Sequence, residues 1–177
     1  MSDLPFFASV KFHTEASMSP WDAPECFVNI IKGDIRAFLT ETDLTEKKVG
    51  EITILKVQVV HALNQHFSLF DICDAHSDWL VSMHQAVFKK EYDTRPELNI
   101  EPGFDDLIVL WNFKIKPKFR SSNAVVRAFE TAITTLGAQS LIVAARNADG
   151  FNFVGVDLTI DEWKMLGFKR IAGTQFL

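Results

Sequence analysis

The segment LIVLWNFKIKP at residues 107–117 predicts the central element of the architecture. It is apolar and rich in β-branched side chains, which is typical of a buried strand, and Pro117 ends it. KFRSSNAVVRAFETAITTL follows at residues 118–136, where apolar side chains recur at helical spacing after a polar opening. Gly137 is expected to end this helix in the left-handed cap position, and SLIVAA at residues 140–145 predicts a second strand.

The turn between this strand and this helix is the candidate functional feature. Backbone N–H groups at a helix N-terminus lack partners within the helix and carry partial positive charge, so they suit a phosphate group. Arg120 stands beside the turn, and Ser121 and Ser122 are expected to cap the helix as well. The sequence therefore predicts an anion site in this turn.

The remaining segments favour a mixed α+β or α/β sheet. Alternating and β-branched runs predict strands, and a helical period predicts one or two helices before the central strand. Thr159 and Glu162 form a capping box that begins a short helix after it. Runs of strands before helices, followed by a strand–helix–strand–helix–strand tail, point to this fold class. The expected elements are strands at 6–13, 26–31, 35–39, 50–60 and 169–172, a bulge or turn at 32–34, and helices within 68–90.

Length and composition describe one globular domain. The chain has 177 residues, of which 47% are hydrophobic, and its sixteen phenylalanines can fill a bulky core. The net charge of −5 argues against nucleic-acid binding, and no apolar run is long enough to span a membrane. Cys26 and Cys73 are too few for a disulfide framework. We expect a cytoplasmic protein with N-terminal strands (1–60), a helical region (61–104) and a second half (105–177).

Residues 71–76 (DICDAH) invite a metal interpretation, because aspartate, cysteine and histidine are metal ligands. Asp71 and Asp74 would lie about one helical turn apart, and so would Cys73 and His76. The spacing matches no zinc or iron pattern, and hard ligands are mixed with soft ones. Acidic residues near the positive end of a helix explain the segment without a metal. No metal site is therefore expected.

The order of these motifs resembles the GNAT superfamily of N-acetyltransferases. In that family a central strand ends in a V-x-P-like sequence, an R-x-x-G-x-G/A turn binds the acetyl-CoA pyrophosphate, and a later Y-x-x-x-G-F ends another helix. Here the strand ends as Ile115-Lys116-Pro117, the turn reads RSSNAV at 120–125, and the late motif reads WKMLGF at 163–168. The motifs cover about a third of the chain and the element order about two thirds.

The resemblance implies a GNAT-like fold: a mixed, twisted, mostly antiparallel sheet, splayed at the central strand, with helices on both faces. It implies acetyl-CoA or another acyl-CoA as co-substrate, with a small-molecule or protein amine as the acceptor, and it is compatible with a homodimer. The strand backbone near residues 112–114 would supply an oxyanion partner. The cofactor-binding residues that it implies are Phe113, Ile115, Arg120, Ser121, Ser122, Asn123, Ala124, Val125 and Asn147.

The implied catalytic residues depart from the family pattern. The family's tyrosine, which often serves as general acid, aligns with Trp163, and an indole cannot shuttle a proton near neutral pH. The central strand carries no carboxylate, so Asp105 and Asp106 at its entrance are the candidate bases. Helices before the central strand help to wall the acceptor groove in this family. The candidates for that wall are His76, Trp79 and His84.

The phosphate turn departs as well. Asn123 and Val125 stand where the family has glycines, and Val is stiff and bulky. Asn147 precedes Gly167 by twenty residues, where the family commonly has about a dozen, so an insertion is expected between them. Three interpretations follow: an acetyl-CoA-dependent N-acetyltransferase, a catalytically inactive GNAT-fold binding or regulatory module, and an unrelated α+β interaction protein.

Overall fold

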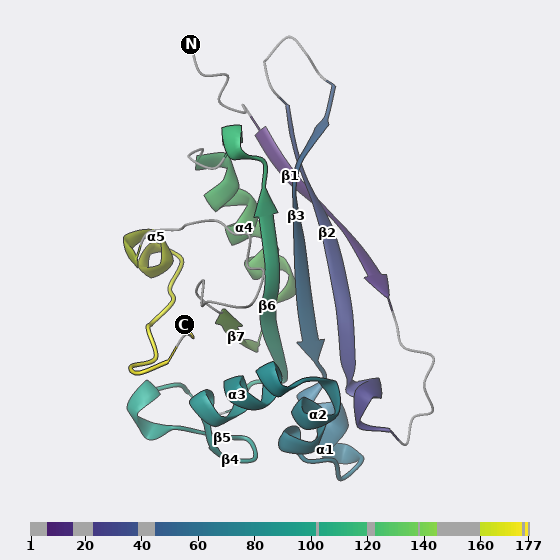
Figure 1. Cartoon of the computed structure of the whole chain (residues 1–177), viewed down its shortest axis with the longest axis vertical. Helices are drawn as coiled ribbons and strands as arrows, with labels where there is room; N and C mark the ends of the chain where they lie inside the picture. Colours follow the sequence, from purple (N-terminus) through teal and green to yellow (C-terminus); the bar gives the residue numbers. More distant parts are fainter. Residues whose placement is uncertain are drawn as a thin grey trace.

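A five-stranded sheet forms the centre of the structure, a computed structural model that describes residues 7–15, 23–38, 45–101, 103–119, 123–137, 139–144, 160–174 and 176 (Figure 1). The strand order is β1-β2-β3-β6-β7. The first four strands run antiparallel to their neighbours, and β7 runs parallel to β6. The strands are β1 (Phe7–Glu15), β2 (Val28–Phe38), β3 (Lys47–Val57), β6 (Asp106–Ile115) and β7 (Ser140–Ala144).

The N-terminal strands cover most of the expected positions, but residues 26–27 belong to a 3-10 turn, η1 (Pro24–Phe27), and β3 ends at Val57 instead of residue 60. The expected turn at residues 32–34 is wrong, because β2 continues through Gly33, which pairs with Phe12 on β1 and Ile52 on β3. A Cβ at Gly33 would lie 2.6 Å from Cγ2 of Ile52, so glycine allows close packing here and does not break the strand. The register instead shifts between Ile35 and Arg36.

One face of the sheet is covered by helices that follow β3 in the sequence. These are α1 (Val59–Asn64), α2 (Leu69–His76) and α3 (Asp78–Val87), so the predicted helices within 68–90 are confirmed. A short hairpin of β4 (Phe88–Lys90) and β5 (Asp93–Thr94) and a 3-10 turn, η2 (Pro96–Leu98), follow α3, so the last three residues of the range expected to be helical form a strand. The buried side chains of this face form the first cluster, which includes Leu55, Leu80, Val109 and Val143.

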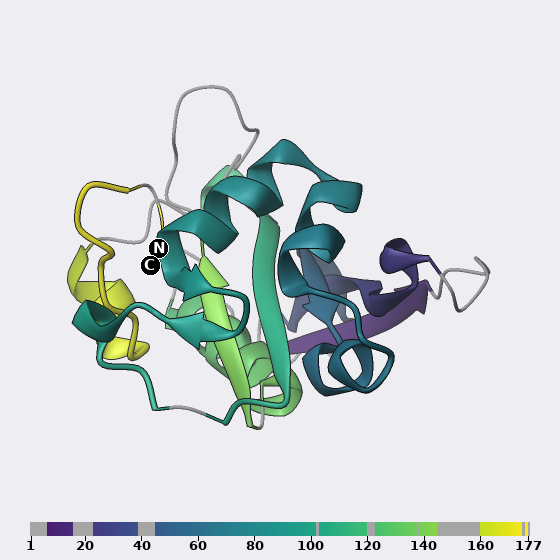
Figure 2. The ribbon, with the colours of Figure 1, turned by 90° about the horizontal axis from the view of Figure 1, so that it is seen from below.

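The opposite face is covered by α4 (Asn123–Leu136) and α5 (Ile160–Met165). The helix predicted after Pro117 is thus confirmed. Its Ala132 packs into the second cluster, together with Ile54, Leu110 and Phe168. Figure 2 shows α2 and α3 on one side of β6 and α4 on the other. The architecture is therefore a mixed α+β fold with a mostly antiparallel open sheet and helices on both faces.

The end of α4 differs from the expectation in one respect. Gly137 does not have a positive φ; the left-handed residue in this connection is Gln139, with φ 60°. A Cβ at Gly137 would lie 2.6 Å from the backbone oxygen of Ile133 and 2.6 Å from Cδ1 of Ile142. Glycine is needed at this position because the end of α4 lies so close to β7 that a side chain has no room.

The end of α5 follows the predicted pattern, but the expected last strand is absent. Gly167 has φ 87°, its N–H donates to the oxygen of Lys164, and the N–H of Phe168 donates to the oxygen of Trp163. These two bonds are those of a Schellman cap. The strand predicted at residues 169–172 is wrong, because the chain turns there: the N–H of Thr174 donates to the oxygen of Ile171.

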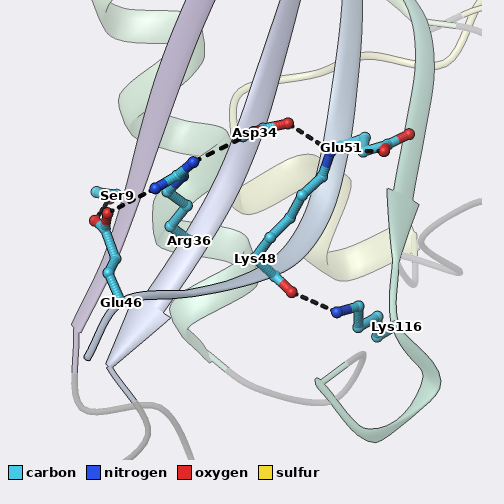
Figure 3. A network of polar contacts seen from close by, with 7 residues as sticks. All are labelled: Ser9, Asp34, Arg36, Glu46, Lys48, Glu51 and Lys116. Atoms are coloured by element: carbon cyan, nitrogen blue, oxygen red, sulfur yellow. Dashed lines mark hydrogen bonds and ion pairs between the residues drawn. The ribbon is translucent and has the colours of Figure 1, made fainter. Parts of the chain in front are cut away.

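A network of polar and charged side chains connects β1, β2 and β3 (Figure 3). Lys48 Nζ lies 2.6 Å from Asp34 Oδ1 and 2.7 Å from Glu51 Oε1. Arg36 bridges Asp34 and Glu46, and Glu46 accepts a hydrogen bond from Ser9. The hydrogen bond and charge of Lys48 lower the pKa of Asp34. This network crosses two strand pairs and so favours their register.

Candidate functional site

The pairing of β6 with the described residues of β7 covers the first half of β6. It runs from Asp106 opposite Ser140 to Leu110 opposite Ala144. Beyond that point β6 continues for five residues to Ile115, whereas the described part of β7 ends. The second half of β6 therefore has β3 as its only paired strand within the described ranges.

A bulge interrupts β6 at this same point. Thr53 of β3 lies opposite Asn112, but the next residue, Ile54, lies opposite Leu110. Trp111 is thus an extra residue, and a bulge of this kind turns two successive side chains to the same face. Trp111 packs against the first cluster, on the α1–α3 face, and Asn112 shares the face of Thr53. Within the described chain, the buried Oδ1 of Asn112 has no hydrogen-bond partner.

Phe113 and Ile115, expected at the cofactor, follow the bulge on the opposite face. Their side chains are 3% and 4% exposed and belong to the second cluster, beneath α4 and α5. A cofactor could therefore meet only the backbone of these two residues without displacing core side chains. Beyond Leu110, the two faces of β6 therefore differ. Phe113 and Ile115 are buried in the second cluster, whereas Trp111 and Asn112 are on the opposite face.

The turn after β6 begins with a short 3-10 segment, η3 (Pro117–Phe119), in which Phe119 is buried and its N–H donates to the oxygen of Lys116. Arg120, Ser121, Ser122 and Asn147 lie outside the described residues. The backbone of Asn123, Ala124 and Val125 forms the first turn of α4. The three residues therefore contribute to the helix N-terminus at the position where the anion site was predicted.

Asp105 and Asp106 lie far from this turn. Asp106 begins β6 and Ile115 ends it, nine residue steps away, which corresponds to about 30 Å along the strand. Asp106 Oδ2 forms an ion pair with Lys56 Nζ, at a distance of 2.8 Å. Both aspartates line an open cavity of about 800 Å³, whose other polar lining includes His61, Gln58 and Asn64. The structure thus brings the two aspartates together but separates them from the turn.

Trp163, the residue aligned with the family's tyrosine, is a core residue in the structure. It is 7% exposed and belongs to the second cluster. Its ring meets Phe168 edge-on, with centroids 4.9 Å apart. Trp163 therefore packs the end of α5 against the sheet, and the Gly-Phe sequence that follows it serves the same packing.

The residues expected along an acceptor groove divide into two groups. His76 and Trp79 both meet Trp111 edge-on, with ring centroids 6.0 Å and 5.0 Å apart. His84 is 7% exposed, stacks on Phe88, and its Nε2 lies 3.1 Å from the oxygen of Glu91. His84 is thus a hydrogen-bonded core residue, whereas His76 adjoins the bulge. Burial lowers the pKa of both imidazoles.

A further cavity of about 480 Å³ lies beside β7, the last strand of the described sheet. Its lining combines apolar side chains of β7 and the segment after α5 with Lys169 and Arg170. In the described parts of the chain, no three His, Cys, Asp or Glu side chains are grouped so as to hold a metal ion.

No protein-family model, curated protein or solved structure matched this chain. Among the helices of the described ranges, none is long and apolar enough to cross a membrane.

Proposed function

We propose that the chain is an acyl-CoA-dependent N-acyltransferase of the GNAT type, with acetyl-CoA as the first ligand to test. One observation carries the proposal: β6 bulges at Trp111, directly after Leu110, the last residue of β6 that pairs with the described part of β7. Backbone groups that leave a sheet ladder need other hydrogen-bond partners. The two amides of the CoA arm are suitable partners, since each carries one N–H donor and one carbonyl acceptor.

The helix that follows supports the same assignment. α4 begins at Asn123, after the turn that continues β6, and its first backbone N–H groups have no acceptor within the helix. A diphosphate there would meet aligned donors and the positive end of the helix dipole. Val125 does not prevent this, because backbone N–H groups donate whatever side chain they carry. The diphosphate and the acyl group of one CoA molecule would then lie along the second half of β6.

The chemistry is direct transfer of the acyl group from sulfur to an amine nitrogen. The protein's contribution is to hold the thioester and the amine together and to stabilise the oxyanion that forms at the thioester carbonyl. A backbone N–H near residues 112–114 is the donor in this proposal, because these residues directly follow the bulge of β6. Asp105 and Asp106 have no part in this step, since they lie at the opposite end of β6.

Calorimetry and thermal unfolding with acetyl-CoA test the proposal. A ligand at 100 times its dissociation constant adds about 2.7 kcal/mol to the free energy of unfolding, which raises the melting temperature by roughly 5–10 °C at this chain length. Arg120→Ala should weaken binding about 10- to 100-fold if the guanidinium meets a phosphate. The matched control is Arg170→Ala, which removes an exposed arginine that follows α5.

Two results would contradict the proposal. The first is neither heat nor a change in melting temperature at millimolar acetyl-CoA, which would favour an inactive binding module. The second is equal loss of affinity in Arg120→Ala and Arg170→Ala, which would indicate nonspecific attraction between the anionic cofactor and the protein surface.

A further inference from the structure

The cavity of about 480 Å³ beside β7 is lined mainly by aliphatic side chains of β7, η2, α4 and the segment that follows α5. Figures 1 and 2 show α5 and the yellow segment after it on the side of β7 away from β6. We propose that this cavity binds a fatty acid of medium chain length, with the alkyl chain against β7 and the carboxylate at Arg170. The inference goes beyond the proposed acyl-CoA site and does not rest on it.

The apolar wall of the cavity includes both faces of β7. Leu141 and Ile142 are successive residues of a strand, so their side chains point to opposite faces of the sheet. Leu141 packs against the first cluster and Ile142 against the second, and both line the cavity. The cavity therefore lies beside the last strand of the described sheet and is open to apolar side chains from both layers of the core.

The aliphatic side chains of this wall are incompletely buried. Strands in parallel pairs are normally buried on both faces, and the sequence of β7 is apolar on both. On β6, Leu107 and Ile108 are 0% and 1% exposed. Their partners on β7, Leu141 and Ile142, are only partly buried. An alkyl chain in the cavity would cover these two residues and the partly buried Leu98, Ile100, Ile133 and Leu166.

Cationic side chains stand where this cavity adjoins a second one. Arg170 lines both cavities, and Arg95 lines the second, which has a volume of about 560 Å³. The Arg95 guanidinium is held in place, because its Nε and Nη2 donate to the oxygen of Gln85 at 3.1 Å and 2.8 Å. Lys169 adds a third cation, and among the described lining residues the only carboxylate is Glu97, 3.5 Å from Arg95 Nη1. This junction therefore attracts an anionic group.

A carboxylate is the anionic group that fits this junction best. An arginine can donate two parallel N–H bonds to one carboxylate, and Arg170 is exposed and able to turn toward either cavity. Glu97 lies in the wall that the two cavities share. Its charge repels a doubly charged phosphate more strongly than a singly charged carboxylate. The lining thus favours a molecule with an apolar chain and one negative charge.

The volume of the cavity limits the length of the chain. A methylene group is about the size of a water molecule, which occupies about 30 Å³ in the liquid, so 480 Å³ has room for at most about 16 such groups. Atoms fill about three quarters of the space in a protein interior, which reduces this to about 12 carbons. Dodecanoate is therefore the probe that should fill the cavity.

Calorimetry with hexanoate, octanoate, decanoate and dodecanoate tests the apolar part of the site. Each methylene group that enters the cavity should raise the affinity about fourfold, so dodecanoate should bind more tightly than hexanoate by a factor of roughly 100 or more. We expect one molecule to bind per chain. The inference is overturned if dodecanoate gives no heat at millimolar concentration, or if the affinity does not increase with chain length.

Arg170→Ala tests the contact with the carboxylate. The affinity for dodecanoate should fall about 10-fold or more, because the charge-assisted hydrogen bonds are lost. The matched control is Lys89→Ala, which removes an exposed cation on β4 and should leave the affinity unchanged. Dodecyltrimethylammonium, with the same chain and a positive head, should bind far more weakly than dodecanoate. Equal binding of the two would overturn the inference, and so would tighter binding of dodecyl phosphate.

Ile100→Trp tests the position of the alkyl chain. Ile100 lines the cavity, is partly buried and belongs to neither cluster, so an indole at this position should occupy the cavity and leave the core intact. We expect an affinity for dodecanoate about 10-fold lower, with the melting temperature the same or higher. The matched control is Leu63→Trp, which adds the same ring at an exposed leucine of α1. An unchanged affinity in Ile100→Trp, or an equal loss in both variants, would overturn the inference.

Two substitutions separate this inference from the proposed function. Arg170→Ala should weaken the binding of dodecanoate and leave the affinity for acetyl-CoA unchanged, whereas Arg120→Ala should do the reverse. A chain that binds dodecanoate but not acetyl-CoA would support the fatty-acid site and contradict the acyl-CoA site. A chain that binds acetyl-CoA but not dodecanoate would support the proposed function and overturn this inference.

Discussion

The imidazole of His76 meets the indole of Trp111 edge-on, with ring centroids 6.0 Å apart and ring planes at 74°. Trp111 in turn meets Trp79 edge-on, and Trp79 meets Phe176. The extra residue of the β6 bulge thus contacts α2 and α3, and Trp79 of α3 in turn contacts the C-terminal segment. Edge-to-face contacts of this kind stabilise aromatic groups beyond the effect of burial alone. The bulge of β6 therefore places the Trp111 ring where it partly covers the titratable imidazole of His76.

Trp111→Ala should therefore change both stability and titration. Loss of the partly buried ring should lower the free energy of unfolding by about 3 kcal/mol. It also exposes His76, so the pKa of that imidazole should rise toward its ordinary value. Denaturant unfolding measures the first effect, and NMR titration of the His76 ring protons measures the second. Trp111→Phe keeps an aromatic edge and should show smaller changes; equal changes in both variants would contradict this account of the contact.

Asp106→Asn tests whether the cavity at the start of β6 is independent of the proposed CoA site. The substitution breaks the ion pair with Lys56, whose two side chains are 22% and 32% exposed, so the loss of stability should stay below about 1 kcal/mol. Acetyl-CoA affinity should be unchanged, because the turn lies about 30 Å along the strand. Calorimetry with acetyl-CoA checks this. A 10-fold weaker affinity for acetyl-CoA would instead indicate that Asp106 contributes to the CoA site.

Asp34→Asn should reduce the acid sensitivity of the sheet. The hydrogen bond and charge of Lys48 lower the pKa of Asp34 in the folded chain relative to the unfolded chain. Its contribution to stability is therefore fully present above about pH 4, the unfolded pKa, and is lost as the pH falls through the lower folded pKa. The variant should be less stable than wild type at pH 7, and the difference should shrink below pH 4. Equilibrium unfolding at several pH values measures this.

The matched control for this prediction is Glu97→Gln, which removes an exposed carboxylate paired with Arg95 at 3.5 Å. It should leave the pH dependence almost unchanged, because a single exposed pair contributes little. A difference between wild type and Asp34→Asn that persists at pH 2 would show that the effect is not linked to ionisation of Asp34.

Gly137→Ala should destabilise the contact between α4 and β7. The new Cβ would lie 2.6 Å from the backbone oxygen of Ile133 and 2.6 Å from Cδ1 of Ile142. We expect a loss of about 1–3 kcal/mol, measured by denaturant unfolding. Ile142→Val removes Cδ1 and should recover only part of this loss in the double variant, since the backbone contact remains. A Gly137→Ala chain as stable as wild type would show that the helix end shifts freely.

Local signals in the sequence were sufficient for the elements nearest the proposed site. The apolar run ended by Pro117 predicted β6, and the helical period before Gly137 predicted α4. Gly167 was correctly placed at the end of α5, because a left-handed cap is a local requirement. Gly137 looked the same in the sequence, yet its reason is a long-range contact with Ile142. A glycine's sequence context does not distinguish these two causes.

The mixed α+β class and the strand–turn–helix–strand order could be predicted from local patterns, because hydrophobic period, proline and capping residues act over a few neighbouring residues. The bulge at Trp111, the contact of His76 with its ring, and the distance of Asp106 from the turn became visible in the folded chain. Those facts depend on strand register and helix packing between segments dozens of residues apart. Such contacts are selected by the best joint burial of the whole core, which no short stretch of sequence encodes.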